Sequence, residues 1–266
     1  MMRILMACLA FLWAGAAQAE TLRMAVTTSF HNSGLSDVLL PAIAEDTGIT
    51  VELLIVGTGQ ALRLGEAGDV DAVLVHAKAS EEAFVAAGYG THRREVMYND
   101  FVIIGPEDDV AGVRDVQNAA EALRAIAVAQ PDFVSRGDES GTHKKELSLW
   151  AAAGEAPDAF GDWYKSVGAG MGASLNVASG LSAYILADRA SWLTFGNKGT
   201  LALLHAGDPA LFNQYAFLPV NPARHAHVKA EAVATLEDWL VSPRAEALIN
   251  GYTLEGEPLF VFNATR

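Results

Sequence analysis

The stretch Ser135 to Trp150 carries residue types that bind oxyanions. It reads SRGDESGTHKKELSLW and follows a short apolar run, so a strand, a Gly/Ser/Thr turn and a helix start are expected in succession. The first-turn N–H groups of a helix have no intrahelical partner and carry the positive end of its dipole. Ser140 or Thr142 adds a hydroxyl donor, and Arg136 adds a planar fork of N–H donors. The pattern predicts a site for a tetrahedral oxyanion.

A purely structural interpretation of the same stretch stays open. Ser140 or Thr142 then only caps the helix, since Ser and Thr are preferred N-cap residues. In that case Arg136 only pairs with a neighbouring carboxylate, either Asp138 or Glu139.

Three other segments repeat the pattern of small polar residues before a helix. Thr27-Thr28-Ser29 follows an apolar strand at Leu22–Val26, and Gly57-Thr58-Gly59 follows Thr50–Val56. The third segment, GAGMG at 168–172, leads into a helix that contains Ser174. In open α/β sheets such turns gather at the carboxyl ends of the strands, where ligands bind. We therefore expect these turns to share one site.

Strands and helices alternate along the chain with short turns, which predicts an α/β fold with mainly parallel sheets. Thr50–Val56 is nearly all apolar, as in a buried parallel strand. Expected helices include Leu35–Asp46 ending at Gly48, a short helix capped by Ser80, and Asp115–Ala129. Two extended segments without linker composition suggest the crossings of a hinged protein. This divides the chain into lobe 1, residues 20–100 and 213–266, and lobe 2, residues 101–212.

The N-terminal 19 residues are typical of a secretory signal peptide. Arg3 precedes the apolar run 4–16, and cleavage is expected after Ala19. We therefore expect an exported, periplasmic protein. Removing the leader takes away its only cysteine, Cys8, and leaves 17 basic and 32 acidic residues, a net charge of 17 − 32 = −15. Such a charge argues against nucleic acid or an anionic membrane as partner, but not against a small anion bound by local dipoles.

Six phrases spread over the chain resemble the periplasmic tungstate-binding proteins of ABC importers. They are VTTSFHNSGL (26–35), VGTGQAL (56–62), GDVDAVLVHA (68–77), VMYNDFVIIGP (96–106), SRGDESGTHKKELSLW (135–150) and MGASLNVAS (171–179). The resemblance implies a two-lobe, type II periplasmic binding fold that closes on tungstate, with molybdate as a competitor. It also implies a membrane permease as partner, no cofactor, no enzymatic activity and a monomeric protein.

The resemblance also implies which residues contact the oxyanion. Carried over by position, they are Thr28, Ser29, Thr58, Ser135, Arg136, Thr142 and Ser174. At Val26 the family usually has a further threonine, so no hydroxyl contact is expected from that position. Tungstate is a dianion with acceptors only, and burying it requires hydrogen-bond donors on every side. Hydroxyls, turn amides and one arginine meet that requirement.

Three alternatives remain. Arg136, Asp138, Ser140, Gly141 and Thr142 also resemble the spacing of phosphate-binding periplasmic proteins, where Asp138 would accept the proton of hydrogen phosphate; sulfate belongs to the same alternative. An exported hydrolase could use Ser29 with His31, or Ser140 with His143. A cation site could use His225 and His227, although one H-x-H is a weak metal motif.

Overall fold

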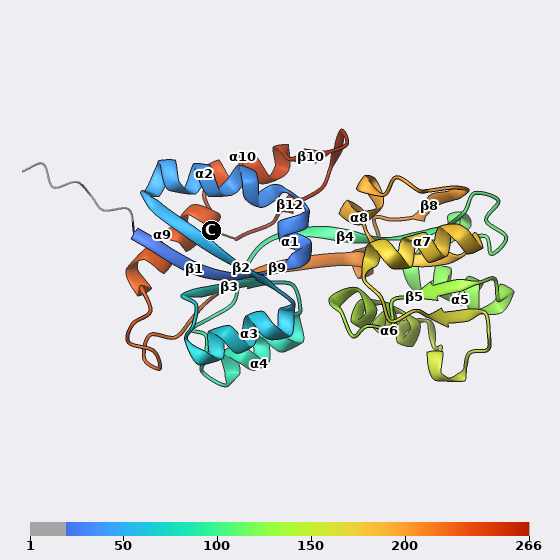
Figure 1. Cartoon of the computed structure of the whole chain (residues 1–266), viewed down its shortest axis with the longest axis horizontal. Helices are drawn as coiled ribbons and strands as arrows, with labels where there is room; N and C mark the ends of the chain where they lie inside the picture. The colour runs from blue at the N-terminus through green and yellow to red at the C-terminus, as the bar shows by residue number, and fades with distance from the viewer. Residues whose placement is uncertain (1–19, 266) are drawn as a thin grey trace, which may run out of the picture.

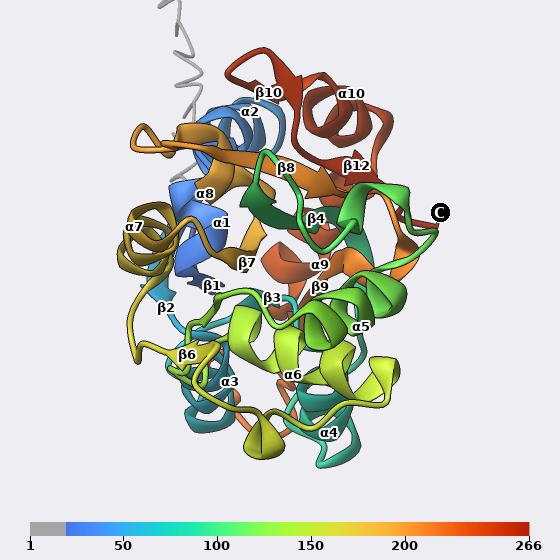
Figure 2. The ribbon, with the colours of Figure 1, turned by 90° about the vertical axis from the view of Figure 1, so that its right-hand side faces the viewer.

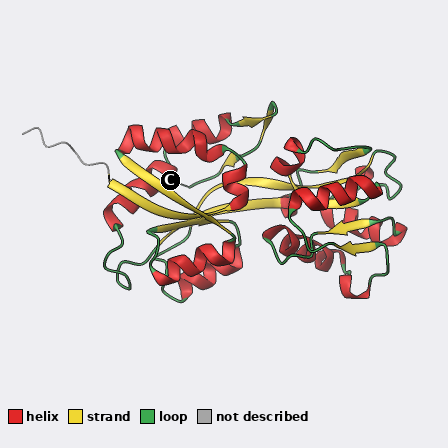
Figure 3. Ribbon diagram, viewed as in Figure 1, coloured by secondary structure: helices red, strands yellow, loops and turns green. Residues whose placement is uncertain are grey.

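The computed structural model describes residues 20–265 and shows two lobes joined by two long strands (Figure 1). The expected leader, 1–19, and its cleavage after Ala19 lie outside the described residues. Within the described range, no helix has the length and apolar character needed to cross a bilayer. Each lobe has strands inside and helices outside (Figure 3), which is the expected α/β arrangement.

The first lobe is built on three parallel strands in the order β2-β1-β3. Side chains alternate along β1, so that Leu22 and Met24 enter one hydrophobic core while Ala25 enters the core on the other face. The strands are β1 (Glu20–Thr27), β2 (Ile49–Val56) and β3 (Ala72–Val75).

Helices cover both faces of this sheet (Figure 1). One face packs against α2 (Leu35–Thr47), α9 (Ala230–Leu240) and α10 (Pro243–Gly251). The other face packs against α3 (Thr58–Ala67) and α4 (Lys78–Ala86). The five-residue helix α1 (Thr28–Asn32) follows β1 directly. Helix α2 ends as expected at Gly48, whose φ of 73° is a left-handed conformation that glycine adopts without steric cost.

The second lobe has the same layered design. Its parallel strands are β5 (Phe133–Ser135), β6 (Tyr164–Ser166) and β7 (Tyr184–Asp188), with β5 in the middle. Figure 2 looks at this lobe end-on and shows helices on two sides of the strands. One side has α5 (Ala119–Ala129) and α6 (Gly141–Ala153), and the other has α7 (Met171–Leu181) and α8 (Arg189–Thr194).

Two strands run through both lobes: β4 (Arg94–Pro106) and β9 (Phe212–Pro219). Strand β4 pairs antiparallel with β9 as far as Asp100, and from Phe101 onward it pairs with β7 and with β8 (Leu201–His205). The complete sheet is therefore mixed, because antiparallel crossing strands join the two parallel sets. The residue-level lobe limits, 20–100 with 213–266 and 101–212, remain a prediction.

The C-terminal segment returns to the first lobe. Phe260 lies in the core between the sheet and α2. The short strands are β10 (Thr253–Leu254), β11 (Glu257–Pro258) and β12 (Val261–Phe262), the last of which pairs with β4.

Three local predictions were wrong. Helix α5 begins at Ala119 rather than Asp115, because Asn118 is its N-cap and accepts a hydrogen bond from the Glu121 N–H at 2.9 Å. Ser80 lies inside α4, which begins at Lys78. Strand β2 is parallel but lies at the edge of the sheet, so only Ile49 and Val51 are buried and its other residues are half-buried or exposed.

Candidate oxyanion-binding site

A cavity of about 440 Å³ lies between the lobes, where the turns after β1, β2 and β3 face the turn after β5. Five of the predicted ligand residues line it. From the first lobe these are Thr28, Ser29 and Thr58, and from the second lobe Arg136 and Thr142. The structure thus brings together residues that are more than a hundred positions apart in the sequence.

Helix starts supply most of the donors at this cavity. Helix α3 begins at Thr58 after Gly57, which offers no side-chain cap, and α6 begins at Gly141. Their first-turn N–H groups have no intrahelical acceptors, and both turns line the cavity. The Ser140 hydroxyl caps α6 by accepting from the His143 N–H at 3.2 Å, so the capping role considered from the sequence is real. It leaves the Thr142 hydroxyl at the cavity wall.

Arg136 is the most enclosed cation of the cavity wall, with 15% of its side chain exposed. One terminal nitrogen forms an ion pair with Asp138, and the other donates to Thr142 Oγ1 at 3.4 Å. Its Nε is buried and has no hydrogen-bond partner among the described residues. A buried N–H without an acceptor is costly, so this donor is suited to an oxyanion that supplies one.

Asp138 faces Arg136 rather than the cavity. Its Oδ1 accepts from the Ser140 N–H at 3.2 Å, while Oδ2 pairs with Arg136. Burial by itself would raise the pKa of this carboxyl, but the hydrogen bonds from Ser140 and Arg136 outweigh it and hold the pKa below its ordinary value. The carboxylate is therefore charged and occupied at neutral pH.

Two predicted ligand residues do not line the cavity. Ser135 and Ser174 are both 0% exposed. The Ser174 hydroxyl donates within its own helix segment to the carbonyls of Ala169 and Gly170, at 3.2 and 3.1 Å. The Ser135 hydroxyl is buried and interacts with the side chains of Glu146 and Tyr164. Their contact with a ligand stays a prediction. Val26, where no hydroxyl was expected, is buried in the core.

Sequence reasoning missed a cluster of polar side chains around Ser29. Its hydroxyl lies 3.0 Å from Thr27 Oγ1, 3.0 Å from His76 Nε2 and 3.4 Å from the Tyr215 hydroxyl. Burial lowers the pKa of His76 to about 4, so its imidazole is neutral at neutral pH. His76 follows the apolar run of β3, and the strand-end rule that found Thr28 and Thr58 would also have found it.

The remaining charges of the cavity wall are more exposed. Arg63 donates to Gln60 Oε1 through Nε and Nη2, at 3.1 and 2.8 Å. Asp188 is the N-cap of α8 and accepts from the Ser191 N–H at 2.9 Å through Oδ1. The other two charged residues are Lys144 and Glu139. Three cations against two carboxylates give this wall a small positive excess although the chain as a whole is acidic.

A buried carboxyl supports the wall from behind. Glu146, on α6, accepts hydrogen bonds at Oε1 from the Tyr164 hydroxyl at 2.6 Å and from Trp150 Nε1 at 3.3 Å. Burial outweighs these bonds and raises the pKa of Glu146 to about 7. It ties α6 to β6, so it positions the turn that carries Arg136.

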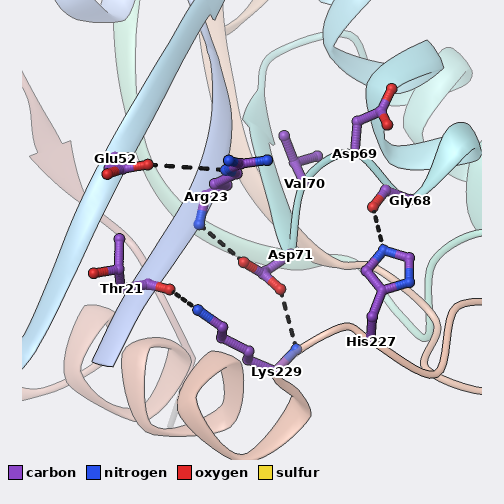
Figure 4. A pocket seen from close by; sticks show the side chains of 9 residues that line it. All are labelled: Thr21, Arg23, Glu52, Gly68, Asp69, Val70, Asp71, His227 and Lys229. Carbon is purple, nitrogen blue, oxygen red and sulfur yellow. Dashed lines mark hydrogen bonds and ion pairs between the residues drawn. The ribbon is translucent and has the colours of Figure 1, made fainter. Parts of the chain in front are cut away.

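A second cavity, of about 460 Å³, lies at the opposite end of the first lobe, near the start of β1 (Figure 4). Its polar groups bind one another. Both oxygens of Asp71 accept from backbone N–H groups, those of Arg23 and Lys229, at 2.9 and 3.0 Å. His227 Nε2 contacts the Gly68 carbonyl at 2.7 Å, and His225 Nε2 contacts that of Glu66 at 3.0 Å. Within residues 20–265 no cluster of three or more His, Cys, Asp or Glu side chains is arranged to hold a metal ion.

Two lobes on crossing strands, with a donor-rich cavity between them, define a binding protein of the two-lobed type. A family model described as a PBP superfamily domain matches residues 14–244. The tungstate-binding protein TupA of Peptoclostridium acidaminophilum is 45% identical over 247 residues, covering 91% of this chain and 86% of that protein.

Solved structures agree with this assignment. The tungstate-binding protein TupA from Desulfovibrio alaskensis G20 is 45% identical, with a TM-score of 0.89 over 93% of this chain and 100% of that chain. The tungstate ABC transporter structure from Geobacter sulfurreducens is 47% identical, with a TM-score of 0.78 over 88% of this chain and 99% of that one. The chain belongs to the PBP superfamily and, within it, to the family of the tungstate-binding TupA proteins.

Proposed function

We propose that this protein captures tungstate, with molybdate as a competitor, for an ABC importer. The observation that supports this most directly is the chemistry of the inter-lobe cavity. Hydroxyls, helix N-termini and the enclosed Arg136, whose Nε has no partner among the described residues, face one space. Donors of this kind match a dianion that only accepts hydrogen bonds. The tungstate-binding names of the relatives agree with this choice of ligand.

Phosphate or sulfate is the second candidate, and two carboxylates bear on how well phosphate fits. Hydrogen phosphate carries a proton and needs an acceptor. Asp138 is already engaged by Arg136 and by the Ser140 N–H, which favours a ligand without a proton. Asp188 lines the cavity and uses only Oδ1 to cap α8, so its second oxygen is the feature that favours hydrogen phosphate.

The arrangement of the two nucleophile–base pairs considered from the sequence argues against a hydrolase. Ser140 Oγ accepts from the backbone N–H of His143, and His31 is exposed on α1 away from the cavity wall. The pair that does meet in the cavity is Ser29 with His76, whose pKa of about 4 leaves a weak base at neutral pH. We infer a binding protein rather than an enzyme.

Transport would follow from the position of the ligand between the lobes. An oxyanion held by Thr58 on one lobe and Arg136 on the other stabilises the closed form over the open form. The closed monomer would then dock on a membrane permease carried by another chain. This role requires export to the periplasm, with the leader removed after Ala19.

The proposal is tested by calorimetric titration and thermal unfolding of the protein lacking residues 1–19, stripped of bound anions. Tungstate, molybdate, sulfate and phosphate are compared at equal concentrations. A ligand at about a hundred times its Kd adds about 2.7 kcal/mol of stability. We expect tungstate to raise the Tm and to bind most tightly or equally with molybdate. A shift with phosphate or sulfate alone would overturn the ligand assignment, and no shift with any of the four would overturn the site.

A further inference from the structure

His76 lies between the two lobes at the binding cavity. Its Nε2 lies 3.0 Å from Ser29 Oγ in the first lobe, and its ring packs against Tyr215 with 4.8 Å between ring centroids. On the other side, a Cβ built at Gly141, the first residue of α6, would lie 3.1 Å from His76 Cε1 and 3.7 Å from Nδ1. The imidazole thus lies between a predicted ligand hydroxyl and the first turn of the helix across the cavity.

The Ser29 hydroxyl has one proton and several neighbours that compete for it. A hydroxyl donates once and accepts twice, and Thr27, His76 and Tyr215 all lie within hydrogen-bonding distance. Ser29 can donate to an oxyanion only if none of these neighbours accepts its proton. A neutral imidazole protonated at Nε2 donates to Ser29 and leaves that proton free, whereas the tautomer protonated at Nδ1 draws the Ser29 proton toward itself and away from the ligand.

Gly141 places the first turn of α6 beside the same ring. A Cβ at position 141 would lie 3.1 Å from His76 Cε1, which is tighter than ordinary van der Waals contact, so even a methyl group there would force His76 to shift. With glycine there, the first turn of α6 approaches the imidazole closely, and its N–H groups reach the cavity. Glycine at this position therefore lets the first turn of α6 come nearer to His76 than a larger residue would.

We propose that His76 is a positioning residue of the oxyanion site, which turns the Ser29 hydroxyl toward the ligand and seats the first turn of α6 when the lobes close. This inference rests on the proposed function, because it assigns His76 a role toward the same oxyanion.

Calorimetric titration with sodium tungstate tests the role through variants of both partners. We expect His76→Ala to raise the Kd about tenfold, because the variant loses one hydrogen bond and the orientation that it gives to the Ser29 hydroxyl. His76→Gln, whose amide nitrogen can take the place of Nε2, should stay within about threefold of the wild type. The matched control is His225→Gln, far from the cavity, which should bind as the wild type does.

Gly141→Ala separates positioning from general stability. It should raise the Kd at least about fivefold when His76 is present, as for overpacking, and much less in a His76→Ala background where the ring is gone. Gly172→Ala is the control, because nothing lies within 4 Å of a Cβ built there. An equal effect of Gly141→Ala in both backgrounds, or a His76→Ala protein that binds within twofold of the wild type, would overturn the inference.

Nitrogen NMR of the wild-type imidazoles gives a readout that needs no variant. With tungstate bound, the His76 ring should be neutral and protonated at Nε2, and a ring protonated at Nδ1 would contradict the role. The two proposals fail differently. A wild-type protein that binds none of the four oxyanions ends both, whereas tight wild-type binding with unaffected His76 variants ends only this one.

Discussion

The buried carboxyl of Glu146 should make the protein less stable as the pH rises toward neutrality. Glu146 is 1% exposed and its pKa is raised from 4.5 to about 7 by burial. Below pH 4.5 the carboxyl is protonated in both the folded and the unfolded chain. Between 4.5 and about 7 the unfolded chain ionises first, so stability falls, and above about 7 the loss is complete. At 1.36 kcal/mol per pH unit, this amounts to about 3 kcal/mol.

Replacing Glu146 by Gln removes this titration while leaving a group of the same shape to accept from Tyr164 and Trp150. The assay is urea unfolding of both proteins, followed by far-ultraviolet circular dichroism from pH 5 to 8. The lost carboxylate hydrogen bonds and the new buried amide give a constant offset. The unfolding free energy of the Gln variant minus that of the wild type should therefore rise by at most about 3 kcal/mol between pH 5 and 8.

The pH dependence of stability that His76 contributes must be kept separate from that of Glu146. The pKa of His76 is lowered from 6.5 to about 4, so its contribution has the opposite sign and stability is lost as the pH falls from 6.5 toward 4. Because His76 is present in both proteins, its contribution cancels in the difference. Exposed Glu66→Gln is the matched control and should show no such shift. A wild-type minus variant difference that changes by less than about 0.5 kcal/mol between pH 5 and 8 would refute the reasoning.

Three further predictions concern the cavity wall and the turn beside it. Arg136→Ala should weaken tungstate binding by about 2–5 kcal/mol, the range for truncating one partner of a buried charge pair, whereas Arg124→Ala, remote from the cavity, should leave binding unchanged. A calorimetric loss of only about a few tenths of a kcal/mol would move Arg136 out of the site. Thr58→Val keeps the shape but loses the hydroxyl, so the Kd should rise about fivefold, and an unchanged Kd would assign the contact to the backbone amides alone. Gly137→Ala should lower the unfolding free energy by at least about 1 kcal/mol. Gly137 has a φ of +59°, and an added Cβ would collide with the Ser166 hydroxyl. An unchanged midpoint of urea unfolding would contradict this prediction.

Local sequence patterns were sufficient to predict the parts of the structure that depend on residues close together in the chain. The strand–turn–helix units around Thr28, Thr58 and Thr142, and the left-handed end of α2 at Gly48, follow from short-range rules of capping, dipoles and glycine conformation. The same rules identified these turns as hydrogen-bond donors, and a site that offers only donors favours an oxyanion.

The direction in which each side chain points was decided by tertiary packing. Ser135 and Ser174 belong to the expected turns, but packing buries both, since a strand end or a first helical turn has an inward and an outward face. Which face is inward depends on the elements that cover it, and these are distant in sequence.

Contacts across the fold were likewise beyond the sequence. His76 meets Ser29 only because β1 and β3 are neighbours in the sheet, and Tyr215 joins them because β9 pairs with β3. The choice between Asp138 facing Arg136 and Asp138 facing the ligand also needed the folded turn. The sequence by itself determined the chemical type of each turn, while the tertiary structure alone decided which turns share a cavity, because sheet order and lobe closure arise from packing between distant segments.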